Sequence, residues 1–364
     1  MEIEKIEERI KEIKEEIKSL PYHKGTEHHI GKLKAQLAKL RSQILEKKSK
    51  KKSEGFAVKK EGDGTVVLVG LPSVGKSTLL NKLTGAKSRV ASYPFTTLKV
   101  IPGILNYKGA KIQILDVPGL IKGAAMGKGR GKEVISVVRV ADLLLLVASA
   151  ENPESVKVME EELYAAGVRI DERKPDVLIE KKTRGGIEIG GRKISLAKET
   201  IRNLAREFGI LNAKITFGEE INQDQLIDVF LGNRIYLPAI KILSKIDLLS
   251  EKEIKDLVRR FGKERLLISS KKNIGLETLK NQIFEKLNLI RVYLRKSSKG
   301  KADSQPLICK KGITVLEAAQ KISQGLAKEV KGAKIKGPSA AFPNQLVGKN
   351  HRLLDGDEIF FVKK

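Results

Sequence analysis

Eight residues that could bind phosphate, at positions 70–77, fit the pattern G-x-x-x-x-G-K-S. The apolar, β-branched residues 65–69 before them predict a buried strand, and the residues after Ser77 predict the start of a helix. A glycine-rich loop between a strand and a helix points backbone N–H groups at an anion. Lys76 would reach the β- and γ-phosphates of a nucleotide, and Ser77 would bind Mg²⁺. The expected phosphate site consists of Gly70, Pro72, Ser73, Val74, Gly75, Lys76, Ser77 and Thr78.

Two further motifs would complete the metal and γ-phosphate contacts. The run D-V-P-G at 116–119 follows a predicted strand and fits D-x-x-G, in which Asp116 holds Mg²⁺ through water and the Gly119 N–H contacts the γ-phosphate. Thr97 ends the run Y-P-F-T-T between the loop and Asp116, where a first switch segment places a Mg²⁺-binding threonine. We therefore expect Ser77, Thr97 and Asp116 as metal residues, and Lys76, Thr97 and Gly119 as catalytic residues.

Two motifs at later strand ends indicate guanine as the base. Residues 244–247, S-K-I-D, fit [NST]-K-x-D. The Asp247 carboxylate would accept both the guanine N1–H and a 2-amino hydrogen, a donor pair that adenine lacks. The run S-S-K at 269–271 fits the loop that contacts guanine O6. The expected base site is therefore Ser244, Lys245, Asp247, Ser269, Ser270 and Lys271, and the bound cofactors are GTP or GDP with Mg²⁺.

The elements that must position these residues alternate between strands and helices. Strands are predicted at 65–69, 98–104, 111–115, 143–147, 238–243 and 265–268, with a turn at 106–109 and a helix near 251–261. Residues 143–147 are all apolar, which is typical of a central parallel strand. This alternation predicts an α/β domain with a mostly parallel sheet.

Further segments flank and interrupt this domain. Apolar residues spaced three and four apart in the first twenty residues, and again from Ile30 to Ile44, predict an antiparallel helical hairpin. The hairpin would bind a partner as a coiled coil or pack on itself, and the sequence does not decide between these. A basic run at 47–53 is either a solvated linker or a contact to a phosphate backbone.

The interval from 166 to 231 is too long for a single crossover connection, so we interpret it as an inserted α+β subdomain. It contains a predicted hairpin at 187–194, with Gly190-Gly191 at the turn, and a predicted helix at 196–208. The residues after about 290 predict a small α+β module with a helix at 315–322. The expected domains are residues 1–61, then 62–165 with 232–289, then 166–231, and finally 290–364.

Composition limits the class of partner and the compartment. The 364 residues carry a net charge of +27, which favours a nucleic-acid partner, and the low aromatic content of 4% favours phosphate contacts over base stacking. No stretch approaches the roughly 18 apolar residues of a membrane span, so no membrane contact is expected. A single cysteine, Cys309, excludes an internal disulfide and suits a reducing cytoplasm. We expect a cytoplasmic monomer.

The runs G-L-P-S-V-G-K-S, Y-P-F-T-T-L and D-V-P-G-L-I-K-G-A-A-x-G-K-G-x-G resemble the Obg-type translation GTPases, and most closely their developmentally regulated GTP-binding protein (DRG) subfamily. The resemblance covers nearly the whole chain. It implies a helical N-terminal region, a P-loop GTPase domain, an S5D2L-like inserted subdomain and a C-terminal TGS domain with a ubiquitin-like grasp fold. It also implies association with the ribosome or RNA and a regulatory protein partner. The lysine-rich composition suggests an archaeal member.

Three departures from the usual motifs affect the expected activity. Leu120 follows D-x-x-G where Ras-like enzymes have a water-orienting glutamine, so hydrolysis is expected to be slow without an ion or a partner. Ser73 stands where many potassium-activated relatives have asparagine, which leaves the ligation of a stimulating K⁺ open. Ser244 replaces the usual asparagine, which is expected to lower affinity and not specificity. The two functional hypotheses are a GTP-hydrolysing switch in translation and a nucleotide-dependent RNA-binding or ribosome-assembly module with negligible turnover.

Overall fold

The computed structural model describes residues 2–21, 26–50, 62–85, 91–92, 99–117, 137–191, 194–298 and 300–363. The chain divides into two compact units, which are described separately. The described residues within 1–56, 119–139 and 157–238 form the first unit, and those within 57–118, 140–156 and 239–364 form the second. This division does not settle the expected domain boundaries, which stay predictions.

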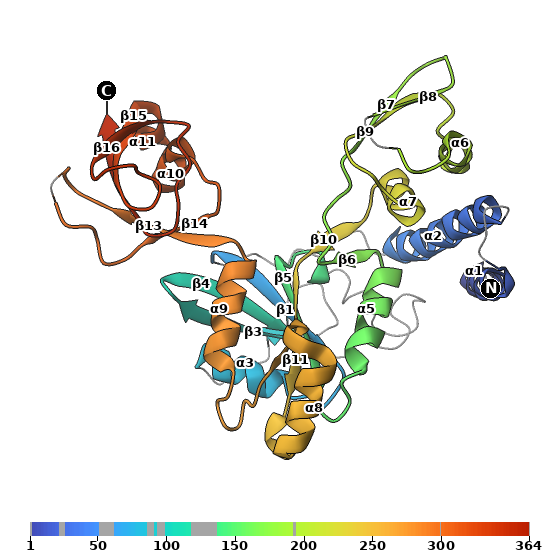
Figure 1. Ribbon diagram of the computed structural model, residues 1–364, viewed down its shortest axis with the longest axis horizontal. Helices are drawn as coiled ribbons and strands as arrows, with labels where there is room; N and C mark the ends of the chain where they lie inside the picture. The colour runs from blue at the N-terminus through green and yellow to red at the C-terminus, as the bar shows by residue number, and fades with distance from the viewer. Residues whose placement is uncertain are drawn as a thin grey trace. The chain divides into compact units, whose positions relative to one another are not determined.

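A mostly parallel sheet forms the centre of the second unit (Figure 1). Its strand order is β12-β11-β5-β1-β4-β3-β2, and every neighbouring pair from β12 to β4 is parallel, whereas the β4–β3 and β3–β2 pairs are antiparallel. The predicted strands and the predicted α/β class are confirmed, with β5 in a central position as its apolar sequence requires. The strands are β1 (Gly64–Gly70), β2 (Ala91–Ser92), β3 (Lys99–Tyr107), β4 (Ala110–Asp116), β5 (Leu143–Ser149), β11 (Ala239–Ser244) and β12 (Arg265–Leu267).

Helices α3 (Lys76–Thr84) and α9 (Leu276–Lys286) cover one face of this sheet (Figure 1). Their apolar side chains share one core with alternate residues of β1, β4, β5 and β11, including Leu68, Leu145 and Ile242. Helix α8 (Glu251–Phe261) begins with a capping box made by Ser250 and Glu253. Helix α5 (Ser155–Ala165) follows β5, and short 3₁₀ turns occupy Ile246–Leu248 and Gly262–Glu264.

The C-terminal residues form a second mixed sheet with its own core. The strand order is β14-β13-β17-β15-β16, in which only the β13–β17 pair is parallel. Helix α10 contributes Val315 and Ala318 to the core, where Cys309 is also buried. The elements are β13 (Leu289–Leu294), β14 (Leu307–Lys310), α10 (Val315–Ile322), α11 (Gln324–Glu329), β15 (Val330–Lys336), β16 (Gln345–Gly348) and β17 (Asp357–Lys363).

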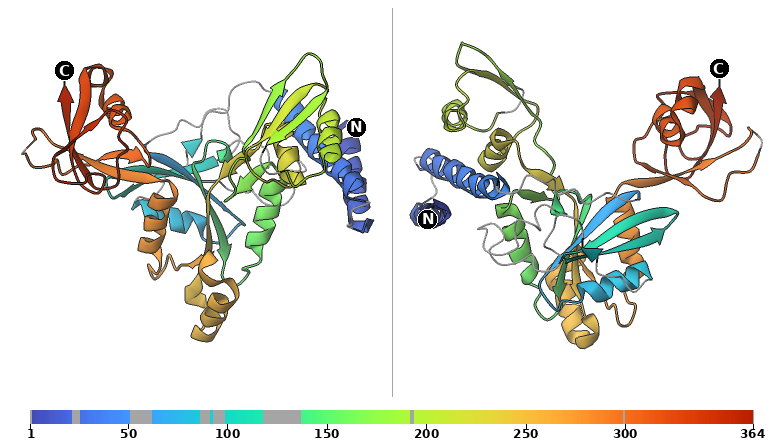
Figure 2. Two further views of the ribbon diagram at one scale, coloured as in Figure 1. Left: turned by 45° about the horizontal axis from the view of Figure 1, so that its top comes forward. Right: turned by 180° about the vertical axis from the view of Figure 1, so that it is seen from behind.

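The first unit begins with two long helices, α1 (Glu2–Ser19) and α2 (Glu27–Lys50), which lie side by side in both views of Figure 2. Ile10 and Ile13 of α1 and Ile30 and Leu33 of α2 are buried. This favours self-packing of the hairpin over a coiled coil with another protein. Helix α2 also contacts α6 (Lys198–Glu207) and α7 (Gln223–Leu231), and its Ala35 lies in their core. The basic run begins inside α2, so it is not wholly a linker.

A three-stranded sheet of order β7-β9-β8 packs with α6 and α7, and β6 (Val168–Ile170) pairs with β10 (Ile235–Leu237). The sheet consists of β7 (Val177–Lys181), β8 (Ile187–Gly191) and β9 (Ala213–Phe217). The predicted hairpin at 187–194 is wrong, because β8 pairs in parallel with β9 and Gly190 and Gly191 lie within the strand. A side chain at Gly191 would meet the Phe217 carbonyl oxygen at 2.3 Å, so this glycine permits close strand approach and does not mark a turn.

Candidate functional site

The glycine-rich loop joins the end of β1 to the start of α3, as the motif predicts. Gly70 packs against β5, and a side chain there would lie 2.5 Å from the Val147 carbonyl oxygen. Ser73 and Gly75 have φ angles of 62° and 93°, so both take the left-handed conformation that turns the loop into the helix. Pro72 and Ser73 are exposed, whereas Val74 is buried.

Lys76 is 7% exposed and folds back over its own loop. Its Nζ donates to the carbonyl oxygens of Gly70 at 3.0 Å and Leu71 at 2.9 Å. Burial lowers the pKa of the Lys76 ammonium group, and the charge of Asp116 opposes this change. An ammonium group has three N–H donors, so one remains for a phosphate oxygen.

The Asp116 carboxylate, at the end of β4, is 2% exposed and faces the start of α3. The Ser77 hydroxyl donates to Asp116 Oδ2 at 2.7 Å. Asp116 Oδ1 is buried and has no hydrogen-bond partner in the described part of the chain. A buried carboxylate oxygen without a partner is costly in free energy, which is consistent with a ligand that supplies one.

These oxygens fit a Mg²⁺ ion. Mg²⁺ binds oxygen ligands and is usually held by one or two carboxylates together with substrate phosphates. Ser77 and Asp116 would supply the protein side of such a site. Within the residues that the structure describes, no group of three or more His, Cys, Asp or Glu side chains is placed to hold a metal ion.

The base motif is built around Asp247. Ser269 is fully buried, and its hydroxyl donates to Asp247 Oδ1 at 2.5 Å while accepting from the Lys272 backbone N–H at 3.0 Å. The Ser269 hydrogen bond lowers the pKa of the Asp247 carboxyl below its ordinary value, and Lys271 adds to the effect. Asp247 is therefore an acceptor at neutral pH. Ser269 was expected to contact the base, but its burial gives it a supporting role.

Ser244 connects the base motif to the phosphate loop. Its buried hydroxyl lies 2.6 Å from the Val74 carbonyl oxygen and 2.9 Å from that of Ala148, so its single proton serves two acceptors. Lys245 follows with a left-handed φ of 62°, which turns the chain into the 3₁₀ segment that carries Asp247.

One pocket of about 260 Å³ is lined by residues of both the phosphate loop and the base motif. Its walls come from the phosphate loop, the base motif and the loop after β12. Leu248 was not among the expected residues, although it follows Asp247 directly and is 59% exposed, and its apolar surface suits the face of a planar base. The lining residues are Val74, Gly75, Thr78, Ser244, Lys245, Asp247, Leu248, Ser270 and Lys271. The expected residues Thr97 and Gly119 lie outside the described part of the chain.

Three family models match successive segments of the chain. They are described as a 50S ribosome-binding GTPase (residues 65–182), the C-terminal region of the same domain (184–289) and a TGS domain (290–363). An uncharacterized GTP-binding protein of Methanocaldococcus jannaschii is 47% identical over 99% of this chain and 93% of that protein. Developmentally-regulated GTP-binding protein 2 of Bos taurus is 40% identical over 98% of this chain and 99% of that protein.

The chain belongs to the developmentally regulated GTP-binding protein family. Membership in this family confirms the expected P-loop GTPase domain and TGS domain, and it makes the chain a GTP-binding protein. The high identity to an archaeal relative favours the expected archaeal origin. None of the helices in the described ranges is long and apolar enough to span a bilayer.

Among solved structures, the cytosolic domain of the T. maritima FeoB iron transporter is 23% identical, with a TM-score of 0.36. The match covers 62% of this chain and 64% of that chain, less than two thirds of either. A likeness of this size adds nothing to the assignment from the DRG family.

Proposed function

We propose that this DRG-family protein hydrolyses GTP slowly to GDP and phosphate and acts as a molecular switch on RNA or the ribosome during translation. The observation that supports this most is that one pocket is lined by both Gly75 of the phosphate loop and Asp247 of the base motif. A phosphate loop alone would serve ATP or GTP equally well, whereas a carboxylate at the other wall favours guanine.

The residues of the pocket would bind the base, and Lys76, Ser77 and Asp116 beside it would serve the phosphates and the metal. Asp247 accepts the guanine N1–H and a 2-amino hydrogen, and Leu248 covers one face of the base. Lys76 donates to the phosphates, with Ser77 and Asp116 placed to hold Mg²⁺. When bound, Mg²⁺ neutralises negative charge on the phosphate oxygens. Thr97 and the Gly119 N–H stay proposals for the metal and the γ-phosphate.

Single-turnover hydrolysis of radiolabelled GTP, with and without purified ribosomal subunits, tests the activity directly. A measurable rate with the protein alone, increased by subunits, supports a switch. The second candidate is an RNA-binding or assembly module in which nucleotide is only a structural ligand, and Leu120 is the observation that favours it. Absence of hydrolysis in both conditions, with normal GTP binding, would select that candidate.

We predict that K⁺ stimulates hydrolysis relative to Na⁺ by roughly tenfold or more, because a cation near the phosphates supplies part of what an arginine finger gives. Ser73 carries a hydroxyl at a left-handed position, which asparagine also tolerates well. The variant Ser73→Asn should therefore fold normally and increase the K⁺ effect by adding an amide oxygen. Initial rates in matched KCl and NaCl measure this, and equal rates in both salts would remove the proposed K⁺ site.

The net charge of +27 supports RNA as the partner. We predict that affinity for a labelled single-stranded RNA falls by roughly 100-fold or more between 50 and 200 mM salt, because binding releases counterions from the phosphates. Fluorescence anisotropy across a salt series measures the slope. Affinity that does not respond to salt would contradict phosphate contacts as the basis of binding.

We also propose a cytoplasmic monomer that responds to a regulatory protein. Deleting the first 60 residues would not cleanly test what they contribute to RNA binding. Ala35 of α2 lies in the core formed with α6 and α7, so the deletion would also remove part of that core. Point substitutions of exposed lysines preserve that core. Co-sedimentation with ribosomal subunits in GTP and in GDP would show whether the association depends on nucleotide.

A further inference from the structure

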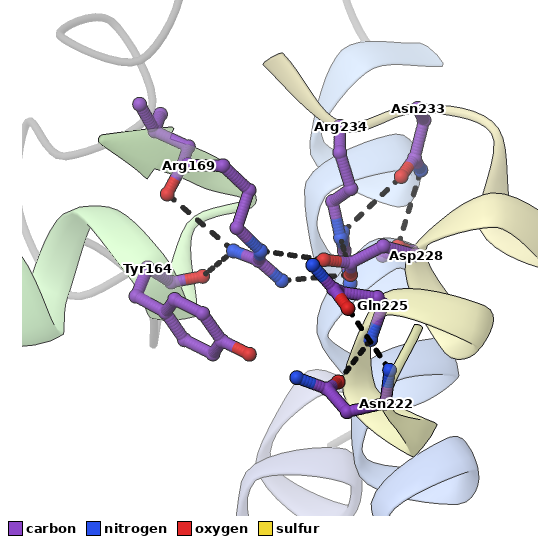
Figure 3. Close-up of polar contacts among 9 residues, drawn as sticks. Tyr164, Arg169, Asn222, Gln225, Asp228, Asn233 and Arg234 are labelled. Carbon is purple, nitrogen blue, oxygen red and sulfur yellow. Dashed lines mark hydrogen bonds and ion pairs between the residues drawn. The ribbon is translucent and has the colours of Figure 1, made fainter. Parts of the chain in front are cut away.

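A buried group of charges joins α5, β6 and α7 in the first unit (Figure 3). Arg169 donates from Nε to Asp228 Oδ2 at 2.5 Å and from Nη2 to Oδ1 at 2.7 Å. Arg234 donates from Nε to the same Oδ1 at 2.8 Å. The guanidinium of Arg169 also lies 3.6 Å from the centre of the Tyr164 ring. One carboxylate therefore serves two buried guanidinium groups, which leaves an excess positive charge.

A pocket of about 320 Å³ opens beside this group. Its walls come from α1, α2, the end of α5, β6 and α7, all within the first unit. Six cationic side chains line it, against the two carboxylates of Asp224 and Asp228. The cationic residues are Lys14, Lys18, Lys34, Arg41, Arg169 and Arg234.

The two carboxylates do not balance these charges. Asp228 is already shared between two arginines, and Asp224 pairs with Lys34 at 3.0 Å. Within the described ranges, Lys14, Lys18 and Arg41 form no ion pair. Glu162 is the further carboxylate whose charge acts on Lys14 and Arg41.

The crowding of like charges is unfavourable for the protein alone. Burial lowers the pKa of Arg41, and the nearby charges of Arg234 and Arg169 lower it further. Burial also lowers the pKa of Lys14, with Arg41 adding to the effect. Apolar side chains of α2 and α7 share the pocket, so water solvates these cations less than on an open surface. A bound anion would relieve this repulsion.

We propose that this pocket binds a phosphate group, carried either by an RNA strand or by a free phosphate compound. Lys14, Lys18 and Arg41, which form no ion pair in the described part of the chain, line it. A phosphate group supplies the opposing charge, one negative charge in an RNA phosphodiester and close to two in a phosphate monoester. The planar guanidinium of Arg41 can hold two phosphate oxygens at once. This pocket shares no residue with the nucleotide pocket, which is the pocket of about 260 Å³ lined by Gly75 and Asp247. The proposal therefore does not depend on GTP hydrolysis.

The test uses the full chain loaded with Mg²⁺ and a non-hydrolysable GTP analogue, so that the phosphate loop is filled. Equilibrium dialysis measures binding of radiolabelled inorganic phosphate to the wild type, to Arg41→Met and to Arg259→Met. Arg259 lies on α8 with its side chain 83% exposed, so its variant removes the same charge elsewhere. We expect Arg41→Met to weaken phosphate binding by roughly tenfold or more, as the loss of a charged donor implies, and Arg259→Met to leave it unchanged.

A parallel titration with single-stranded RNA identifies the source of the phosphate. If RNA supplies it, Arg41→Met weakens RNA binding by a similar factor and inorganic phosphate competes with the RNA. If a free phosphate compound supplies it, Arg41→Met loses phosphate binding but keeps the RNA affinity of the wild type. Arg41→Met removes repulsion, so its unfolding midpoint without phosphate should equal or exceed that of the wild type. Lys14→Met provides a second variant at the same site.

The proposal is overturned if neither phosphate nor RNA binding depends on Arg41 and Lys14. Failure of GTP hydrolysis would not affect this result, because the hydrolysis assay and the dialysis assay report on different pockets. Phosphate binding that is lost in Arg259→Met to the same extent would also overturn it, since that outcome reflects net charge alone.

Discussion

Replacing Asp247 by asparagine is expected to lower the affinity for GTP by roughly 10³-fold or more and to shift the preference towards xanthosine triphosphate. The carboxylate accepts two guanine donors, and an asparagine amide presents an N–H where one of them points, which leaves buried polar groups unpaired. Xanthine carries a 2-carbonyl group that the amide can donate to. Calorimetric titration of the wild type and the variant with GTP and, separately, with xanthosine triphosphate measures both affinities.

The matched control for this variant is Asp256→Asn on α8. Asp256 is a half-exposed carboxylate of the same unit that pairs only with Arg259 in the described structure. It should bind GTP as the wild type does. Unchanged GTP affinity in Asp247→Asn would reject the guanine assignment, because among the residues that the structure describes Asp247 is the only acidic side chain that lines the pocket.

The second large effect is on stability, where Asp228→Ala is expected to destabilise the first unit by about 3–5 kcal/mol. The substitution leaves the guanidinium groups of Arg169 and Arg234 buried without a counter-charge, and these side chains are only 3% and 8% exposed. Urea denaturation followed by circular dichroism gives the change in free energy of unfolding. Hydrogen exchange of the α7 amides localises the change to the first unit.

Asp224→Ala is the comparison for this variant. Asp224 lies on the same helix and pairs with Lys34, but both side chains are partly exposed, so the loss should be about 0–1 kcal/mol. Replacing all three buried charges, as Arg169→Met/Asp228→Leu/Arg234→Met, should recover much of the lost stability. Equal and small losses in Asp228→Ala and Asp224→Ala would contradict a buried, interdependent charge group.

The nucleotide pocket was largely predictable from sequence because its residues belong to short motifs at strand ends. The contact between Ser77 and Asp116 follows from the alternation of strands and helices, which places the ends of β1 and β4 at one edge of the sheet. The supporting role of Ser269 was not predictable, since a serine that contacts the base and one that orients Asp247 have the same sequence signal.

The long-range contacts of the first unit could not be predicted in this way, because no short sequence motif marks them. Arg169 and Asp228 are 59 residues apart and meet only because β6, α7 and β10 pack together. Gly190 and Gly191 were misinterpreted for a similar reason. A glycine pair indicates a turn from local geometry, whereas here Gly191 is required by the nearness of Phe217 on a neighbouring strand.

The Ser244 hydroxyl has a thermodynamic consequence for how nucleotide is recognised. It holds the Val74 carbonyl group of the phosphate loop against the strand that ends in the base motif. A shift of either segment therefore disturbs the other, so the pocket walls that would face the base and the phosphates are coupled. Serine achieves this linkage with one proton shared by two carbonyl oxygens.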